Sequence, residues 1–396
     1  MQGIKYFPQD LEVKGKRIII RLDLNVPLKD KKIQDSTRIE QIIPFLNDLI
    51  KRKSRIILIS HLGRPKGVKD SNLSLLPIYK YLKERLSTNM YFYTGEINDG
   101  IKVKSSYLKE SEILLIENIR FFKEETENDE NFSKKLGELG EIFINNAFSC
   151  SHRKHSSIHN ITKFIKENYA GPLLKKEIIA IDSVIKNKKN PLTCIIGGSK
   201  VSTKIGIISS LMKNVSNIVI IGAMANNFLA YKKYEIGKSL KEDGSEEIVR
   251  KILEKADENK CKIIIPEDCL VSTSFEGEAT SKDIKLVEKN DVILDIGPRT
   301  IKIIDKIIDS SNTIMWNGPA GYFENKNFAL GTNSIAQKIS ENTKNRSLIS
   351  VLGGGDTVSA INKSGLKLSF THLSTAGGAF LEYLEVKDLP GLSVLK

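Results

Sequence analysis

The chain has 396 residues, which is more than one ordinary hydrophobic core accommodates and fits two domains. Its composition, 40% hydrophobic and 28% charged residues, is that of a globular protein and argues against extended disorder. The formal net charge of +13 leaves nucleic acid, an acidic membrane surface or small anionic substrates open as partners. Acidic residues are interleaved with the lysines along the chain, so we interpret most of this charge as solvated surface.

In the first half, short apolar runs alternate with amphipathic stretches. Apolar runs without alternation are typical of strands covered on both faces, so the pattern predicts a parallel sheet wrapped by helices. The expected strands are residues 17–23, 55–61, 113–118 and 142–145, and the expected helices are residues 39–51 and 78–86.

Basic residues follow several of these predicted strands. Arg64, Arg120 and Arg153 stand in the turns after the second, third and fourth runs. The carboxyl ends of parallel strands meet at one edge, where several guanidinium groups would repel one another unless an anion neutralised them. We therefore favour a phosphate or carboxylate clamp over three independent surface arginines. His61 ends the second run, and Arg38 precedes a helix, where a cation opposes the dipole.

The pattern changes near residue 172, where we place a domain boundary. Residues 173–185 read as a long helix, and a polar run over residues 186–191 follows it. A helix followed by a basic turn is a reasonable hinge. We expect an N-terminal domain over residues 1–172, a hinge helix and linker over 173–190, and a C-terminal domain over 191–378.

The second half repeats the alternation, which makes it a second doubly wound α/β domain. The expected strands are residues 192–196, 217–221, 262–265, 292–296, 313–316 and 348–352, and the expected helices are 205–212, 225–231, 246–259, 302–308 and 334–340.

Glycine turns follow three strands of this half. After the first, Lys200 and Lys204 are four residues apart and would share one face of a helix, within reach of the same phosphates. After the fifth, a rigid turn carries Glu324, a carboxylate suited to ribose hydroxyls.

The most informative turn is Gly353, Gly354 and Gly355, followed by Asp356 and a helix over residues 357–363. Glycines let the backbone approach a ligand, and the N-terminus of a helix suits phosphate. Asp356 has two readings, as a helix cap or as a ligand of Mg²⁺. Residues 374–379 open a last helix, with one more N-terminus for a phosphate.

Cysteine usage and the start of the chain bear on location. Cys150, Cys194, Cys261 and Cys269 form no C-x-x-C pair, which favours a reducing compartment. The chain starts without the apolar core of a signal peptide and has no apolar run of membrane-spanning length. We expect a soluble cytoplasmic monomer with no membrane partner.

Taken together, the turns resemble those of the phosphoglycerate kinase family. The resemblance runs from Arg21 to Gly391, and its most specific motifs are residues 21–27, 60–65, 197–204, 316–324 and 353–357, in family order. It implies two Rossmann-like doubly wound parallel-sheet lobes joined by a hinge helix. The first would bind 3-phosphoglycerate and the second MgATP or MgADP, with closure about the hinge, and the C-terminal segment 379–396 would pack back on the first lobe.

The resemblance also implies roles for individual residues. Asp23, Asn25 and Arg38 would contact the carboxylate and hydroxyl end of the substrate, and His61, Arg64, Arg120 and Arg153 its remote phosphate. Lys200 and Lys204 would contact nucleotide phosphates and the group in transit, while Asn317, Pro319 and Glu324 line the nucleoside. Gly353, Gly354, Gly355, Asp356 and Thr357 would hold nucleotide phosphates, with Asp356 on Mg²⁺. Gly377 and Gly378 would offer N–H groups to the transferred phosphoryl; with Arg38, Lys200 and Lys204 they make up the expected catalytic set.

Three positions depart from the family pattern. Asn146 replaces an Asp, Ala376 replaces the first glycine of a triplet, and Ile221 replaces the first of two glycines near the adenine. We expect altered local hydrogen bonding at the first two and a narrowed or reshaped adenine pocket at the third.

Rival functions lack their own signatures. The P-loop pattern G-x-x-x-x-G-K-[ST] is absent, as is G-x-G-x-x-G after the first strand, which an oxidoreductase would need. The alternative from another class is a basic nucleic-acid-binding protein without kinase activity. It predicts basic surfaces rich in aromatic residues or a known reader module, and neither is found.

Overall fold

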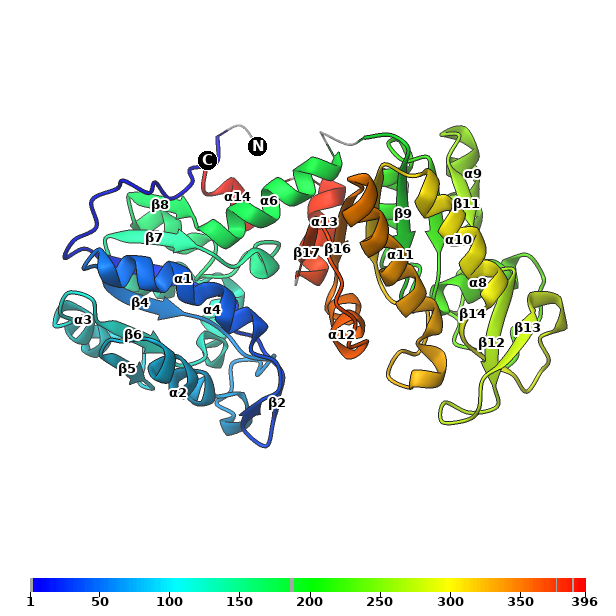
Figure 1. Cartoon of the computed structure of the whole chain (residues 1–396). Helices are drawn as coiled ribbons and strands as arrows, with labels where there is room; N and C mark the ends of the chain where they lie inside the picture. Colours follow the sequence, from blue (N-terminus) through cyan, green and yellow to red (C-terminus); the bar gives the residue numbers. More distant parts are fainter. Residues whose placement is uncertain (1–2, 186–188, 375, 387) are drawn as a thin grey trace. The chain divides into compact units, whose positions relative to one another are not determined.

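In the computed structural model, which describes residues 3–185, 189–374, 376–386 and 388–396, the chain divides into two compact units. The first contains the residues up to Ile178 together with Asp388–Lys396, and the second contains the residues between. Each unit is built around a parallel sheet with helices on its faces (Figure 1). The prediction of two doubly wound lobes is confirmed.

The first unit has a sheet of six parallel strands in the order β5-β6-β4-β1-β7-β8. Ile18 and Ile20 pack into one apolar core and Ile19 into another, so both faces of the sheet are covered, as the uninterrupted apolar runs predict. The strands are β1 (Arg17–Arg21), β4 (Arg55–Ile59), β5 (Met90–Tyr93), β6 (Ile113–Ile116), β7 (Ile142–Asn145) and β8 (Glu167–Ala170), and a hairpin joins β2 (Leu28–Lys29) to β3 (Lys32–Ile33). The helices are α1 (Thr37–Lys51), α2 (Leu76–Arg85), α3 (Asp99–Ser106), α4 (Lys123–Glu127) and α5 (Glu130–Gly137), with 3₁₀ turns at Ser71–Leu73, Ile119–Phe121, Phe148–Cys150 and Asn160–Phe164.

The helix predicted as a hinge is α6 (Pro172–Ile185). Asn146 caps its first turn, since its Oδ1 accepts from the N–H groups of Leu173 at 2.8 Å and Leu174 at 3.3 Å. The substitution of Asn for Asp therefore keeps the acceptor that the helix needs. Residues 186–188 of the predicted linker lie outside the described residues.

The C-terminal return is shorter than the predicted segment 379–396. Only Asp388–Lys396, which includes α14 (Pro390–Ser393), belongs to the first unit, where Gly391 N–H donates to Ser151 O at 2.8 Å. The preceding α13 (Gly377–Val386) packs on α7 (Ile205–Met212) in the second unit. Its apolar side, with Phe380 and Tyr383 buried, holds it there.

The second unit has six parallel strands in the order β11-β10-β9-β15-β16-β17. Figure 1 shows α10 and α11 lying together over one face of this sheet. The strands are β9 (Leu192–Ile196), β10 (Asn217–Ile220), β11 (Lys262–Ile264), β15 (Thr313–Asn317), β16 (Ile349–Gly353) and β17 (His372–Ser374). The remaining helices are α8 (Ala223–Tyr231), α9 (Glu246–Glu258), α10 (Pro298–Ser310), α11 (Leu330–Arg346) and α12 (Gly355–Lys363), with 3₁₀ turns at Ile284–Leu286 and Lys326–Phe328.

Two details of the predicted alternation are wrong. The run at residues 292–296 is a strand, β14 (Val292–Ile296), but it pairs antiparallel with β12 (Asp268–Ser272), which also pairs with β13 (Thr280–Asp283). Apolar periodicity identifies a strand without identifying its partner. The second is the shared helical face of Lys200 and Lys204: α7 covers the predicted residues 205–212, so both lysines precede it, and residues 202–204 form a turn.

No helix among the described residues has the length and hydropathy needed to cross a membrane.

Candidate active site

In the first unit, the turns after the parallel strands meet at the carboxyl edge of the sheet. Arg38, in the first turn of α1, places Nη1 2.8 Å from Asp23 Oδ2 and donates to the carbonyl of Asn25 at 2.9 Å. Both side chains of this ion pair are more than three-quarters buried. The carboxylate offsets the unfavourable position of a cation at a helix start and fixes the direction of the guanidinium.

The turn after β4 links this pair to Arg120. Asn25 Oδ1 accepts from Gly63 N–H at 2.8 Å, and Arg120 Nη1 donates to Gly63 O at 2.8 Å. The Nε of Arg120 is buried and has no hydrogen-bond partner among the described residues. The Nε–H group of Arg120 can therefore still donate a hydrogen bond, at a position from which bulk water is excluded.

His61 lies beside a buried relay that sequence reasoning did not single out. Arg21 Nη2 is 3.2 Å from His61 Nδ1, and Arg21 Nε donates to Ser157 Oγ at 2.9 Å. Ser157 Oγ in turn donates to Glu125 Oε1 at 2.6 Å. Burial raises the pKa of Glu125, and its hydrogen bonds with Ser157 oppose that shift. The position of Arg21 at the end of β1 is the feature of the sequence from which this set of contacts could have been predicted.

The pKa values of this region report an excess of positive charge. Burial and the neighbouring Arg21 and Arg153 lower the pKa of Arg120 to about 10, while the nearby thiol of Cys150 and the carboxylate of Glu125 partly counter them. Burial and the arginines lower the pKa of His155 to about 3 and that of His152 to about 4. Burial, with Arg21 next, also lowers the pKa of His61 well below its ordinary value. Each shift disfavours a cation, so a bound anion would be strongly stabilised here.

Arg64 and Arg153, the other two arginines of the predicted clamp, are less buried than Arg120. Arg64 is exposed, whereas Arg153 is half-buried and its Nε lies 3.1 Å from His152 Nε2. Both arginines contribute to the lowered pKa of His152, after its burial. The three predicted clamp arginines therefore share one electrostatic environment, as expected from their place after successive strands.

In the second unit, one hydrogen-bond network connects the predicted glycine turns. Lys204 Nζ donates to Asn317 Oδ1 at 2.7 Å and to the carbonyl of Gly197, and Asn317 Nδ2 donates to Gly353 O at 2.6 Å. Thr357 Oγ1 donates to Gly353 O at 3.0 Å and accepts from Gly318 N–H at 2.8 Å. Burial lowers the pKa of Lys204 to about 8, and the carboxylate of Asp356 opposes this shift.

Two helix starts lie next to each other at this network. Gly354, with φ of 113°, precedes α12, and a side chain there would meet Asn317 Nδ2 at 2.7 Å. A Cβ on Gly355 would meet nothing within 4 Å, and one on Gly377 would stand 3.6 Å from Gly354 Cα. Gly378 is exposed on the first turn of α13. Helix N-termini and open glycine backbone suit an anion.

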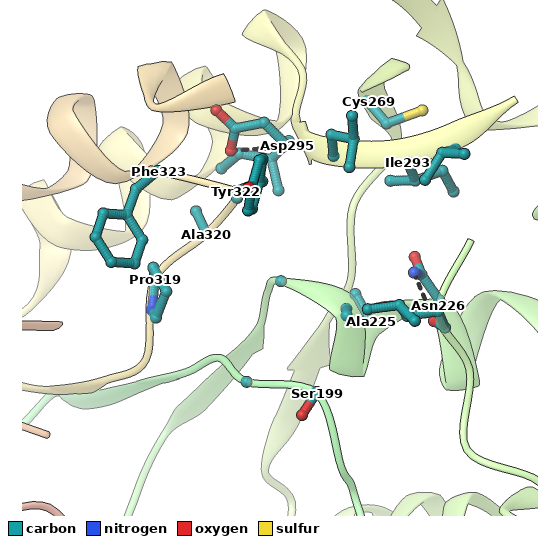
Figure 2. Close-up of a pocket in the computed structure, with 18 of the residues that line it drawn as sticks. Ser199, Ala225, Asn226, Cys269, Ile293, Asp295, Pro319, Ala320, Tyr322 and Phe323 are labelled. Atoms are coloured by element: carbon teal, nitrogen blue, oxygen red, sulfur yellow. Dashed lines mark hydrogen bonds between the residues drawn. The ribbon is translucent and has the colours of Figure 1, made fainter. Parts of the chain in front are cut away.

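A cavity of about 270 Å³ lies beside these turns (Figure 2). Pro319 and Glu324, two of the three residues predicted to line the nucleoside, line this cavity, together with Asp356, Gly198 and Gly222. Lys200 is exposed and, like Asn317 and Thr357, does not line the cavity. Asn317 and Thr357 instead fix the turns around it through the network described above.

Sequence reasoning missed Asp295, a buried lining residue of this cavity. Burial raises the pKa of Asp295 to about 7. Two hydrogen bonds oppose this shift, because the N–H groups of Gly331 and Ile296 donate to its two oxygens at 2.8 and 2.9 Å. It follows β14 residue Leu294, whose carbonyl accepts from Tyr322 N–H at 2.7 Å. The sequence analysis placed β14 in the parallel sheet, so it did not predict that β14 contacts the turn after β15.

The expectation for Ile221 is wrong. Its side chain is fully buried in the apolar core with Val219 and Trp316 and does not line the cavity. At the end of β10 the side chain points into the sheet core, so the cavity wall at this point is Gly222 and Ala223. Ala376 is buried, and its N–H donates to Ser374 Oγ at 3.1 Å.

Comparison with known proteins gives one consistent result. The model of the family described as phosphoglycerate kinase matches residues 8–387. The phosphoglycerate kinase of Wolbachia pipientis wMel is 41% identical over 390 residues, covering 98% of each chain, and that of Dictyoglomus turgidum is 42% identical, covering 98% of this chain and 97% of the relative. The solved phosphoglycerate kinase of Coxiella burnetii is similar with a TM-score of 0.85 at 37% identity, covering 98% of this chain and 97% of its own, and that of Pyrococcus horikoshii OT3 with 0.86 at 27% identity, covering 98% of both.

Proposed function

The chain belongs to the phosphoglycerate kinase family, and from this premise we propose how its two units divide the reaction. The reaction is the reversible, Mg²⁺-dependent transfer of a phosphoryl group between ATP and the carboxylate of 3-phosphoglycerate, giving ADP and 1,3-bisphosphoglycerate. The first unit binds 3-phosphoglycerate, and the second binds the nucleotide. The predicted closure about α6 stays a prediction.

The observation that carries the first assignment is the crowding of arginines around Arg120, whose pKa is lowered by its burial and by Arg21 and Arg153, next to histidines whose pKa values are also lowered. His61, Arg64, Arg120 and Arg153 hold the remote phosphate, whose charge offsets their repulsion. Asp23, Asn25 and Arg38 contact the carboxylate and hydroxyl end, with Arg38 held by its ion pair to Asp23. A dianionic phosphate is the ligand that this donor set fits best.

In the second unit, the cavity takes the nucleoside against Pro319 and Glu324, with Asn317 fixing the adjoining turn. Lys200, Lys204 and the turn from Gly353 to Thr357 contact the nucleotide phosphates, and Gly377 and Gly378 face the group in transit. The support is the adjacency of two helix starts and the half-buried Lys204.

Asp356 fits a Mg²⁺ that is held mainly by substrate phosphates. Its carboxylate is exposed, lines the cavity and lies close enough to Lys204 to influence its pKa. The described residues contain no cluster of three or more His, Cys, Asp or Glu side chains that could hold a metal alone. One carboxylate plus phosphate oxygens is the usual arrangement for Mg²⁺, which neutralises phosphate charge when bound.

The chemistry requires little beyond positioning and neutralisation. A carboxylate acceptor is already ionised at neutral pH, so no general base is needed. Arg38, Lys200, Lys204 and the N–H groups of Gly377 and Gly378 would stabilise the charge on the transferred group.

We propose further that the chain acts as a cytoplasmic monomer and that nucleic acid is not a partner. Cys150, Cys194, Cys261 and Cys269 are free thiols, which suit a reducing compartment. Light scattering after gel filtration tests the first statement. Salt-dependent binding to random DNA at physiological ionic strength would contradict the last.

The test of the reaction is ATP-dependent phosphorylation of 3-phosphoglycerate, with the acyl phosphate trapped by hydroxylamine. Arg38→Ala is expected to lose activity by about 10²- to 10³-fold, the scale of losing one transition-state donor. Arg52→Ala is the matched control, because Arg52 ends the same helix, has a similar side-chain exposure of 21% against 22%, and also pairs with an aspartate. Full activity in Arg38→Ala, or no turnover by the folded wild type with Mg²⁺, would refute the assignment.

A further inference from the structure

His61 is almost completely buried, and its two ring nitrogens have different surroundings. Nδ1 lies 3.2 Å from Arg21 Nη2 and 3.8 Å from Cys150 Sγ. Nε2 has no hydrogen-bond partner among the residues that the structure describes. One nitrogen is thus engaged inside the fold, and the other is available to a ligand.

The contact with Arg21 decides which nitrogen of His61 carries the proton. A guanidinium group has N–H donors and no acceptor, so His61 Nδ1 must accept from Arg21 Nη2. A neutral imidazole whose Nδ1 accepts a hydrogen bond carries its proton on Nε2. Burial, with Arg21 next, lowers the pKa of His61 well below its ordinary value, so the ring is neutral at pH 7. His61 therefore presents an N–H donor to a ligand.

Arg21 can orient His61 only if its own guanidinium group is fixed. The Arg21 side chain is fully buried, its Nη1 donates to the carbonyl of Leu22, and its Nε donates to Ser157 Oγ at 2.9 Å. The carbonyl of Leu22 is adjacent in the chain, whereas Ser157 is 136 residues away. Ser157 thus sets the direction of Arg21 from a distant part of the first unit.

Ser157 meets Arg21 as an acceptor because Glu125 binds both of its donors. Ser157 Oγ donates to Glu125 Oε1 at 2.6 Å, and Ser157 N–H donates to Glu125 Oε2 at 2.8 Å. A hydroxyl group has a single hydrogen, so once this hydrogen points to Glu125, a lone pair of Oγ is left for Arg21 Nε. Glu125 is fully buried, so water does not compete for its oxygens.

We propose that Ser157, held by Glu125, is a positioning residue of the substrate site: through Arg21 it keeps His61 in the Nε2–H form, which donates to an anionic oxygen of the substrate. The inference rests on the proposed assignment of the first unit to 3-phosphoglycerate. His61 then contributes a directed hydrogen bond, and the arginines contribute the positive charge. Without the Ser157 hydroxyl, Arg21 Nε loses its acceptor and the guanidinium can turn away from His61 Nδ1.

The first measurement determines the tautomer of His61 in the free enzyme. In protein labelled with ¹⁵N-histidine, a long-range ¹H–¹⁵N correlation spectrum at pH 7 distinguishes the Nδ1–H, Nε2–H and imidazolium forms. The His61 signals are those missing from the spectrum of His61→Gln. The wild type is expected to show the Nε2–H form. An Nδ1–H form or an imidazolium would overturn the inference, whether or not any variant of Ser157 folds.

The second measurement compares Ser157→Ala with Ser156→Ala as the matched control. Both serines are fully buried, but Ser156 Oγ donates to the carbonyls of Glu124 and Asp129. Ser157→Ala is expected to show both neutral forms of His61 and a KM for 3-phosphoglycerate raised by about tenfold, the scale of one hydrogen bond, with KM for MgATP unchanged. Ser156→Ala keeps the wild-type values, and Ser157→Thr, which retains the hydroxyl, restores them.

Wild-type KM values and a wild-type His61 spectrum in Ser157→Ala would overturn the role of Ser157. Calorimetric titration of the wild type with 3-phosphoglycerate, followed by the same spectrum, separates this failure from that of the substrate assignment. Binding together with an Nδ1–H form in the free enzyme refutes the positioning role alone. No binding, or binding that leaves the His61 signals unchanged, refutes both.

Discussion

Raising the pH from 7 to 9 is expected to weaken nucleotide binding through Lys204. Burial lowers the pKa of this lysine to about 8, from an ordinary value of 10.5, so the free enzyme loses the Lys204 charge in this interval. At pH 9 only about one molecule in eleven keeps the proton, and the apparent Kd rises by about tenfold if the bound phosphates require the ammonium. The nucleotide phosphates are fully ionised over this range and do not account for the change.

Titration calorimetry with MgADP across this pH range measures the effect. At pH 8 in two buffers of different ionisation enthalpy, binding should take up about half a proton, because half of the free enzyme is deprotonated there. Lys204→Arg is the control, since guanidinium stays charged throughout and its affinity should vary little with pH. A flat wild-type profile, or equal slopes in wild type and Lys204→Arg, would refute this role of Lys204.

Three further outcomes are expected. The pKa values of His152 and His155 are lowered from 6.5 to about 4 and about 3, so each group destabilises the fold as the pH falls below 6.5, by up to about 1.4 kcal/mol per pH unit. In urea unfolding, the free energy of unfolding of His155→Gln should therefore rise by about 2 kcal/mol relative to that of the wild type between pH 7 and pH 5. The absence of a relative rise would count against the assignment. Asn146→Ala removes the acceptor for two N–H groups of α6 and should lower the free energy of unfolding by about 1–2 kcal/mol, while Asn146→Asp keeps the cap; equal stability of the alanine variant would contradict this. Thr357→Val leaves the buried N–H of Gly318 unpaired, so it should cost about 1–3 kcal/mol in thermal unfolding and raise KM for ATP; a rise in KM for 3-phosphoglycerate instead would be unexpected.

The parallel strands and their turns could be predicted because their signals are local. β1, β4, β9 and β16 begin or end within two residues of the predicted positions, since each is a continuous apolar run that ends at a polar or glycine-rich turn. The charged residues after these strands could then be placed at one edge by topology alone. The positions of Arg120 and Lys204 after their strands follow from this reasoning, whereas Arg38 was selected because a cation at a helix start opposes the dipole.

The residues that were missed depend on partners far away in sequence. Asp295 lies on a strand that looks like its parallel neighbours, and only its antiparallel pairing with β12 places it against the turn at Tyr322. The direction of Arg21 likewise depends on Ser157, 136 residues later, whose Oγ accepts from Arg21 Nε. β12 and β13 were not predicted; β13, Thr280–Asp283, is a polar run with no apolar period to reveal it. Local pattern cannot supply such information.

Both units hold cations in places where the free protein disfavours their charge. Burial, assisted in the first unit by other cations, moves the pKa of Arg120 to about 10 and that of Lys204 to about 8. Neutral side chains at these positions would make the native state more stable, because a desolvated cation lowers its stability. In the proposed complexes a phosphate would restore the lost electrostatic energy to these groups, so part of the cost to the free protein would return as affinity for an anion. On the proposed assignment, the burial that disfavours these two cations in the free protein therefore favours the binding of an anion beside each of them.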